Sequence, residues 1–187
     1  MATWTLFGNT IPGTIDSADV GEVNLATIFK ATSAGNINGV RFYKSSANIG
    51  THIGTLRAMD TTLLGQVTFT GESISGWQEM LFASPIAIAA NTQYQMTVYF
   101  PVGRYSRDAG FFSSEFSNLP LIGVADADTP AGNGQYGYGN SSTIPNASFG
   151  ATNYYVDVIF EDSAPPSGNL LYPPRLDGLG YQFRGLE

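Results

Sequence analysis

Apolar and polar side chains alternate along residues 93–100. In an extended chain the two faces would carry Tyr94, Met96, Val98 and Phe100 on one side and Gln93, Gln95, Thr97 and Tyr99 on the other. A period of two residues indicates a β-strand with one face on a core and one toward water, because successive side chains point to opposite sides. No stretch of useful length has the 3.6-residue period and capping residues of an amphipathic helix. The chain is therefore predicted to be all-β.

Similar short apolar runs, each bounded by Gly, Asn, Ser or Pro, recur along the chain. Residues 154–160 are apolar on nearly both faces, which indicates a strand in the middle of its sheet. Hydrophobic residues make up 43% of the chain and charged residues only 12%, with 22 Gly, which suits strands and tight turns rather than helices. These features predict a two-sheet antiparallel β-sandwich of jelly-roll type. The predicted strands are residues 23–31, 39–44, 55–59, 66–70, 77–82, 93–100, 135–138 and 154–160, with shorter edge pieces at 4–7 and 86–88.

The end of the chain differs in character from the part before it. Residues 161–168 contain paired prolines with Ser and Gly, which favour an extended linker, so the sandwich domain is expected to span residues 1–160. Residues 169–187 are too apolar for a free tail and too few for a core of their own. We predict that they form an extended tail that docks on a partner chain or on its own domain. The predicted docking residues are Leu170, Leu171, Tyr172, Leu179, Tyr181 and Phe183.

The charge and the apolar stretches restrict the partners. Fifteen Asp and Glu against eight Lys and Arg give a formal net charge of -7. A polyanion would meet net repulsion over most of such a surface, so we expect no nucleic-acid partner. The longest apolar stretch, around residues 86–90, is far too short to span a bilayer, so we expect no membrane partner. The chain starts without the basic and apolar regions of a secretory signal, which predicts a protein that is not exported by that route.

The residue types that carry most catalytic chemistry are scarce. The chain has no cysteine, which excludes disulfides, thiolate metal sites and a thiol nucleophile. The single histidine, His52, lies between Gly50 and Gly54, which favours a turn residue making one hydrogen bond over a general base. No G-x-S-x-G nucleophile elbow is present. A glycosidase needs two carboxyls across a cleft, and their separation cannot be read from the chain. The acids available for such a pair are Glu72, Glu79, Asp108 and Glu115.

Two loop motifs resemble known binding loops. Residues 132–137 match the spacing G-x-G-x-x-G of a dinucleotide fingerprint, but no preceding strand and following helix are predicted, which favours an ordinary loop. Asp126 and Asp128 begin like a calcium loop, but Pro130 and Ala131 replace an oxygen ligand and the turn glycine. An EF-hand is therefore excluded. A looser Ca²⁺ site on a sandwich, using Asp126, Asp128, Asp16 or Asp19 with backbone carbonyls, stays open beside a solvated acidic loop, and no other cofactor is expected.

Aromatic side chains in long loops give the best indication of a binding site. Residues 100–153 contain Gly-, Ser-, Asn- and Asp-rich connections around short aromatic pieces, and long loops on a rigid sandwich commonly carry binding residues. A sugar ring offers apolar C–H faces to an aromatic plane while amides and carboxylates satisfy its hydroxyls. We therefore predict a glycan site, with the alternative that the same aromatics close one end of the core. The candidate ligand-binding residues are Arg104, Tyr105, Asp108, Asn133, Tyr136 and Tyr138.

Several short motifs follow one another in an order typical of one family. They are residues 39–44 (GVRFYK), 50–56 (GTHIGTL), 67–72 (VTFTGE), 76–78 (GWQ), 103–105 (GRY), 132–138 (GNGQYGY) and 153–158 (NYYVDV). In this order the chain resembles the bacterial domain of unknown function four-zero-eight-two over about residues 6–160. The resemblance implies a β-sandwich of a kind associated with large secreted, multidomain surface or glycan-related proteins. It provides no catalytic residues to carry over.

Two functions fit these features. The first is a non-catalytic subunit of a bacteriophage virion, in a head-decoration, fibre-base or tail-associated position, because a particle assembled in the host cytoplasm needs no export signal. It implies contacts with other virion or coat subunits and a homo-oligomer. The alternative is a carbohydrate-binding module of a secreted bacterial protein, located outside the cell or at its surface, where it meets cell-surface glycans. Neither function needs catalysis, and we expect no enzyme.

Overall fold

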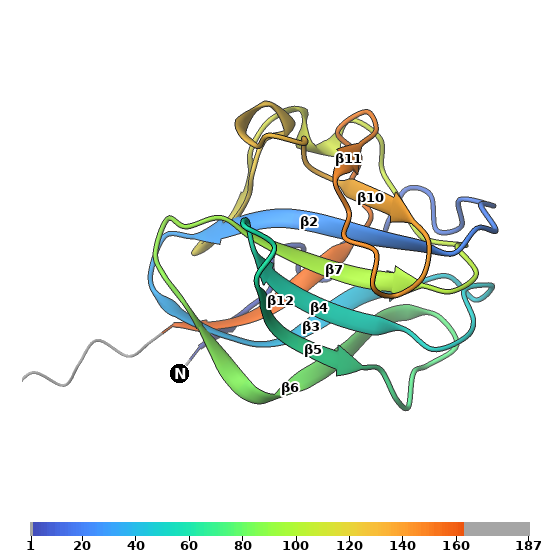
Figure 1. Cartoon of the computed structure of the whole chain (residues 1–187), viewed down its shortest axis with the longest axis horizontal. Coiled ribbons are helices and arrows are strands. Elements are labelled where there is room, and N and C mark those ends of the chain that lie inside the picture. The colour runs from blue at the N-terminus through green and yellow to red at the C-terminus, as the bar shows by residue number, and fades with distance from the viewer. Residues whose placement is uncertain (1, 163–187) are drawn as a thin grey trace, which may run out of the picture.

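Eight main strands form antiparallel pairs that are nested in the sequence (Figure 1). The computed structural model describes residues 2–162, which form two facing antiparallel sheets. The first strand pairs with the last, β2 with β7, β3 with β6 and β4 with β5. This nested pairing is that of a jelly roll, so the predicted sandwich is confirmed. The eight strands are β1 (Thr3–Trp4), β2 (Val23–Ala31), β3 (Gly35–Lys44), β4 (Ile53–Ala58), β5 (Leu63–Thr68), β6 (Gly76–Ile88), β7 (Tyr94–Phe100) and β12 (Val156–Asp162).

The segment between β7 and β12 enlarges one of the two sheets. The first sheet has the order β1-β12-β3-β6, and the second runs β11-β10-β2-β7-β4-β5, with β9 also on β2 and β8 on β9. In Figure 1, β10 and β11 lie above β2, and the loop between them runs down across β7. Among residues 2–162 no helix is long and apolar enough to cross a membrane. The added elements are β8 (Phe116–Asn118), β9 (Leu121–Gly123), β10 (Gln135–Tyr138), β11 (Ala147–Ser148) and 3-10 turns at Phe111–Ser113 and Asp126–Asp128.

Most predicted strands differ from the observed ones only in extent. β2 and β10 have the predicted bounds, and β12 lies between β1 and β3, in the middle of its sheet, as expected. Residues 86–88, predicted as a separate piece, instead continue β6. The strand tolerates Pro85 because β6 is the outer strand of its sheet, and a register shift between Ile37 and Gly39 of β3 absorbs the irregularity.

Both faces of β7 are covered, although its alternation predicted one face toward water. The opposite face carries Gln95 and Thr97, whose exposed fractions are only 6% and 4%. The Gln95 amide donates to Oε1 of Gln135 at 2.6 Å and to the carbonyl of Pro145 at 2.9 Å. The prediction of a wet face is therefore wrong, because the segment between β7 and β12 covers it and its polar groups replace water as hydrogen-bond partners. The core face is as predicted, with Tyr94, Met96, Val98 and Phe100 all buried.

A buried carboxylate ties the N-terminal segment to the middle of the first sheet. Asp157 on β12 accepts hydrogen bonds from the main-chain N–H groups of Leu6 at 2.7 Å, Phe7 at 3.1 Å and Val158 at 2.6 Å. The Nε atom of Arg41 lies 3.9 Å from its Oδ2. Burial raises the pKa of Asp157 to about 6, although Arg41 and the three N–H groups act to lower it. Burial of the ionised carboxylate therefore costs free energy, and this cost depends on pH.

The raised pKa of Asp157 predicts a pH dependence of stability. Between the usual pKa of 3.8 and about 6, the folded protein keeps a proton that the unfolded chain releases, so this group lowers the free energy of unfolding as the pH rises. In the Asp157→Asn variant this contribution disappears, and the two pH profiles should differ by up to about 3 kcal/mol across the window. Urea unfolding at pH 4 to 7 measures both profiles.

The matched control for this experiment is Glu79→Gln, because Glu79 lies 3.5 Å from the same Arg41 but has an exposed side chain. This variant should keep the wild-type profile. Parallel profiles for wild type and Asp157→Asn would show that Asp157 does not titrate in this range.

Candidate functional site

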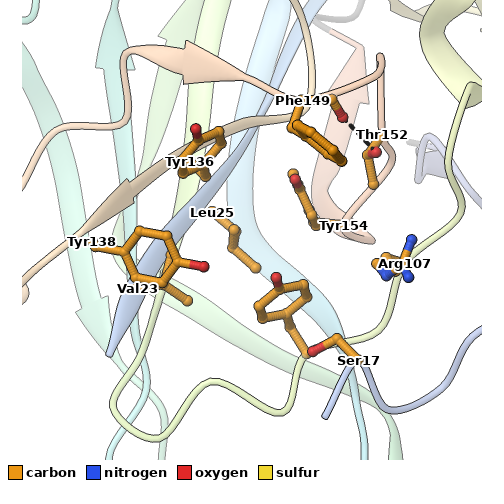
Figure 2. A pocket seen from close by; sticks show the side chains of 10 residues that line it. Ser17, Val23, Leu25, Arg107, Tyr136, Tyr138, Phe149, Thr152 and Tyr154 are labelled. Atoms are coloured by element: carbon orange, nitrogen blue, oxygen red, sulfur yellow. Dashed lines mark hydrogen bonds between the residues drawn. The ribbon is translucent and has the colours of Figure 1, made fainter. Parts of the chain in front are cut away.

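A cavity of about 350 Å³ opens beside the β2–β10 pair (Figure 2). Its volume lies within the range of about 300–1,000 Å³ that is typical of small-molecule sites. Half of its lining residues are aromatic, namely Tyr105, Tyr136, Tyr138, Phe149 and Tyr154. The others are Ser17, Val23, Leu25, Arg107 and Thr152.

The register between β2 and β10 places two of the rings over two aliphatic side chains. Tyr136 lies opposite Leu25, and Tyr138 lies opposite Val23. Residues directly opposite in an antiparallel pair share a face of the sheet, so the four side chains form one continuous surface. The two tyrosine ring centroids are 5.9 Å apart. Figure 2 shows both rings on one side of Leu25, with Tyr154 on the other.

The opposite part of the cavity wall is formed by Tyr154, just before β12. Tyr154 packs edge-on against Tyr105, with ring centroids 5.4 Å apart and planes at 86°. Tyr155 has φ 55°, an uncommon left-handed conformation, and its N–H donates to Oδ1 of Asn153 at 2.7 Å. The Tyr155 ring packs in the core, 5.6 Å from Phe7. Both tyrosines are therefore part of the core, and Tyr154 also lines the cavity.

Asp19 fixes two of the cavity rings through their hydroxyls. Tyr138 and Tyr105 both donate to its Oδ2, at 2.6 Å and 3.1 Å, and the N–H of Gly21 donates to its Oδ1 at 3.0 Å. Burial acts to raise the pKa of Asp19, but these hydrogen bonds lower it overall. The same contacts raise the pKa of Tyr138, and burial raises that of Tyr105 further. Both hydroxyls are therefore protonated donors at neutral pH, and the rings are held before any ligand arrives.

The polar groups of the cavity come from three loops. The Thr152 hydroxyl donates to the carbonyl of Phe149 at 2.7 Å, and Oγ of Ser17 accepts from the N–H of Asp19 at 3.3 Å. Among the described residues that line the cavity, Arg107 is the only charged one. Burial raises the pKa of Tyr154 to about 12, while the charge of Arg107 acts to lower it.

The predicted ligand-binding residues divide into two groups. Tyr105, Tyr136 and Tyr138 line the cavity. Arg104 does not, because its guanidinium pairs with Asp16 at 2.5 Å. Asp108 does not line it either, since its carboxylate accepts hydrogen bonds from the N–H of Gly13 at 2.9 Å and from the hydroxyl of Tyr155.

Asn133 does not line the cavity and instead binds main-chain groups. Its side chain is fully buried, and its amide accepts from the N–H of Ile28 at 2.8 Å while donating to the Ile28 carbonyl at 2.9 Å. It also donates to the Val124 carbonyl and accepts from the N–H of Gly134. The amide therefore acts as an additional strand residue on β2. Residues 132–137 lead into the strand β10 and not into a helix, as the loop interpretation predicted.

The sequence interpretation missed Arg107, Phe149, Thr152 and Tyr154. The apolar neighbours of Tyr154 predict a core position, which the structure confirms, but they do not indicate that Tyr154 also lines the cavity. The other three lie in loops without periodicity, so no local pattern distinguishes them. The clustering of aromatic residues in the long loops was the one available signal.

The other acidic and basic candidates have partners away from the cavity. His52 was predicted to be a turn residue with one hydrogen bond, which is wrong: it packs 4.7 Å from the Phe42 ring at the start of β4 and is fully buried. Its Nδ1 lies 2.8 Å from Glu72 and its Nε2 2.8 Å from Asn48. Burial lowers its pKa, although Glu72 raises it. The three glutamates considered above, Glu72, Glu79 and Glu115, pair respectively with Lys44, Arg41 and Lys30.

The acidic loop shows internal hydrogen bonds. Oδ1 of Asp126 accepts from the N–H of Asn133 at 2.9 Å and from the Ser148 hydroxyl at 3.0 Å. Within residues 2–162 no group of three or more His, Cys, Asp or Glu side chains is placed to hold a metal ion. Calcium binding through Asp126 and Asp128 stays a prediction. The predicted docking residues Leu170 to Phe183 lie outside the described part of the chain.

Comparison with known families assigns the chain. Residues 9–156 match the model of the Domain of unknown function (DUF4082). The chain belongs to the DUF4082 family. No curated protein matches it. All the residues that line the cavity fall inside the DUF4082 match, so the cavity is part of the family domain and not of an appended segment.

The role of Asn133 is testable by its removal. Asn133→Ala removes one hydrogen bond from each of four main-chain groups, of which the Ile28 carbonyl keeps the N–H of Val124 as a partner, so we expect the free energy of unfolding to fall by about 2–4 kcal/mol. Chemical denaturation followed by tyrosine fluorescence measures the change. Asn146→Ala, at an exposed position in the same segment, is the control and should change stability by less than about 0.5 kcal/mol. Equal effects of the two substitutions would contradict the role of Asn133.

Proposed function

We propose that this DUF4082 domain is a non-catalytic recognition module that binds a saccharide in the tyrosine-lined cavity. The observation that carries the proposal is the set of five aromatic rings around one space of about 350 Å³. Saccharide rings present apolar C–H faces that pack on aromatic planes, and their hydroxyls need hydrogen-bond partners close by. Cavity size and lining both suit one or two sugar rings.

Exposure of the rim rings supports this function over a purely structural one. Phe149 is 72% exposed and Tyr138 is 57% exposed, whereas core aromatics such as Phe42 and Phe100 are fully buried. An exposed aromatic surface beside a cavity is available for stacking. Ser17 and Thr152 add hydroxyl groups at the same wall.

The lining supports recognition rather than hydrolysis. Glycoside hydrolysis commonly uses two carboxyl groups on opposite sides of the scissile bond. Within residues 2–162, no Asp or Glu lines this cavity, and Asp19 already accepts hydrogen bonds from two tyrosine hydroxyls. Binding without chemistry is the function that these groups favour.

A panel of oligosaccharides tests the proposal. We expect at least one to bind the protein with weak affinity, and Tyr136→Ala to weaken this binding about fivefold, since an aromatic contact contributes about 1 kcal/mol. Isothermal titration calorimetry measures affinity, and circular dichroism checks that the variant is folded.

Tyr99→Ala is the matched control, because Tyr99 is a partly exposed tyrosine of the same sheet that does not line the cavity. It should bind like the wild type. Absence of binding across the panel, or equal affinity of wild type and Tyr136→Ala, would contradict the proposal.

We also propose that the module is displayed by a larger assembly, of which a virion is the example favoured by the sequence. The support is the apolar composition of residues 169–187, which would hold the chain to neighbouring subunits. Deleting the residues after Pro165 should leave a folded saccharide-binding domain that no longer sediments with particles from its source. Continued incorporation of the truncated chain into particles would contradict this role.

A further inference from the structure

Arg107 differs from the other basic residues of the described chain. Residues 2–162 contain six Lys and Arg side chains, of which four form ion pairs and Arg57 donates to the carbonyl of Thr61. The guanidinium of Arg107 has neither kind of contact with any residue in this range. It is half-buried at the cavity wall, and Figure 2 shows it on the Tyr154 side. An arginine with five N–H donors therefore faces the cavity without a partner from the described chain.

The backbone of Arg107 is fixed although its side chain is not bonded. Arg107 and Thr14 exchange two main-chain hydrogen bonds, of 3.2 Å and 2.8 Å. These hold the residue at the wall independently of its guanidinium. A substitution of the side chain is therefore expected to leave the local backbone unchanged.

The acidic side chains of the surrounding loops already have hydrogen-bond or ion-pair partners. Both oxygens of Asp19 accept hydrogen bonds from the chain, Asp16 pairs with Arg104, and Asp108 accepts from Gly13 and a core tyrosine. None of the three lines the cavity. The charge that faces the open space is positive, although the chain as a whole carries -7.

We infer that the cavity selects a saccharide that carries a carboxylate, which Arg107 binds. The inference rests on the saccharide-binding function proposed above and names the class of sugar. A planar guanidinium binds a carboxylate through two parallel N–H···O bonds, and the nearby tyrosine rings would pack on the apolar face of the same sugar. Uronic acids and sialic acids both present this chemistry.

Two matched pairs of ligands test the inference. One pair is trigalacturonate and its methyl ester, and the other is 3′-sialyllactose and its methyl ester; the members of each pair share one sugar framework and differ only in whether the carboxyl groups are ionised or esterified. We expect the acidic member of at least one pair to bind at least tenfold more tightly. The pair that shows the preference identifies the kind of acidic sugar. Arg107→Gln should remove the preference while retaining binding of the neutral member.

Arg57→Gln is the control, since it removes one positive charge away from the cavity. Its preference should equal that of the wild type. Equal affinity for acidic and neutral members, a preference that survives Arg107→Gln, or an equal loss in Arg57→Gln would overturn the inference and leave the saccharide function standing. Failure of all four ligands to bind at millimolar concentration would overturn the inference and count against the saccharide function as well.

Discussion

β10 is held along the outer side of β2 by an antiparallel ladder that the Asn133 side chain extends. The ladder sets Tyr136 opposite Leu25 and Tyr138 opposite Val23, and the Asn133 amide adds a further two-way pairing with Ile28. A slip of one residue would turn both rings to the other face of the sheet, because strand side chains alternate. The cavity therefore depends on one strand register that a fully buried amide helps to fix.

The cavity is organised before any ligand binds. Asp19 holds two tyrosine hydroxyls, and Tyr105 in turn packs against Tyr154. Rings that are already fixed lose little conformational freedom on binding, which favours affinity in a small site. The guanidinium of Arg107 has no such bond within the described chain. We therefore propose it as the group that contacts a ligand through its charge.

The architecture was predictable because its signals are local. A period of two residues identifies each strand separately. The run that forms β12 is apolar on nearly both faces, which indicates a central position in its sheet. Tyr105, Tyr136 and Tyr138 were identifiable because they lie in short aromatic pieces of residues 100–153, which are surrounded by long connections rich in small polar residues. β11, with two residues, is too short to show any period.

What the sequence could not provide depends on contacts between distant residues. The Gln95 side chain is buried and bonds to Gln135 and Pro145, which lie 40 and 50 residues away in the sequence. Asn133 and Arg107 are both polar loop residues, yet one is buried against the main chain and the other faces the cavity. Composition does not distinguish an amide that pairs with its own backbone from one that pairs with a ligand.

The most direct test of the account is to observe the tyrosine rings while a saccharide binds. The chain has ten tyrosines, four of which line the cavity, so ring carbon–proton NMR spectra report on the site and on the rest of the fold together. With a binding saccharide, the account predicts shifts of the Tyr105, Tyr136, Tyr138 and Tyr154 signals and unchanged signals from Tyr43 and Tyr94. Shifts confined to tyrosines outside the cavity would contradict it.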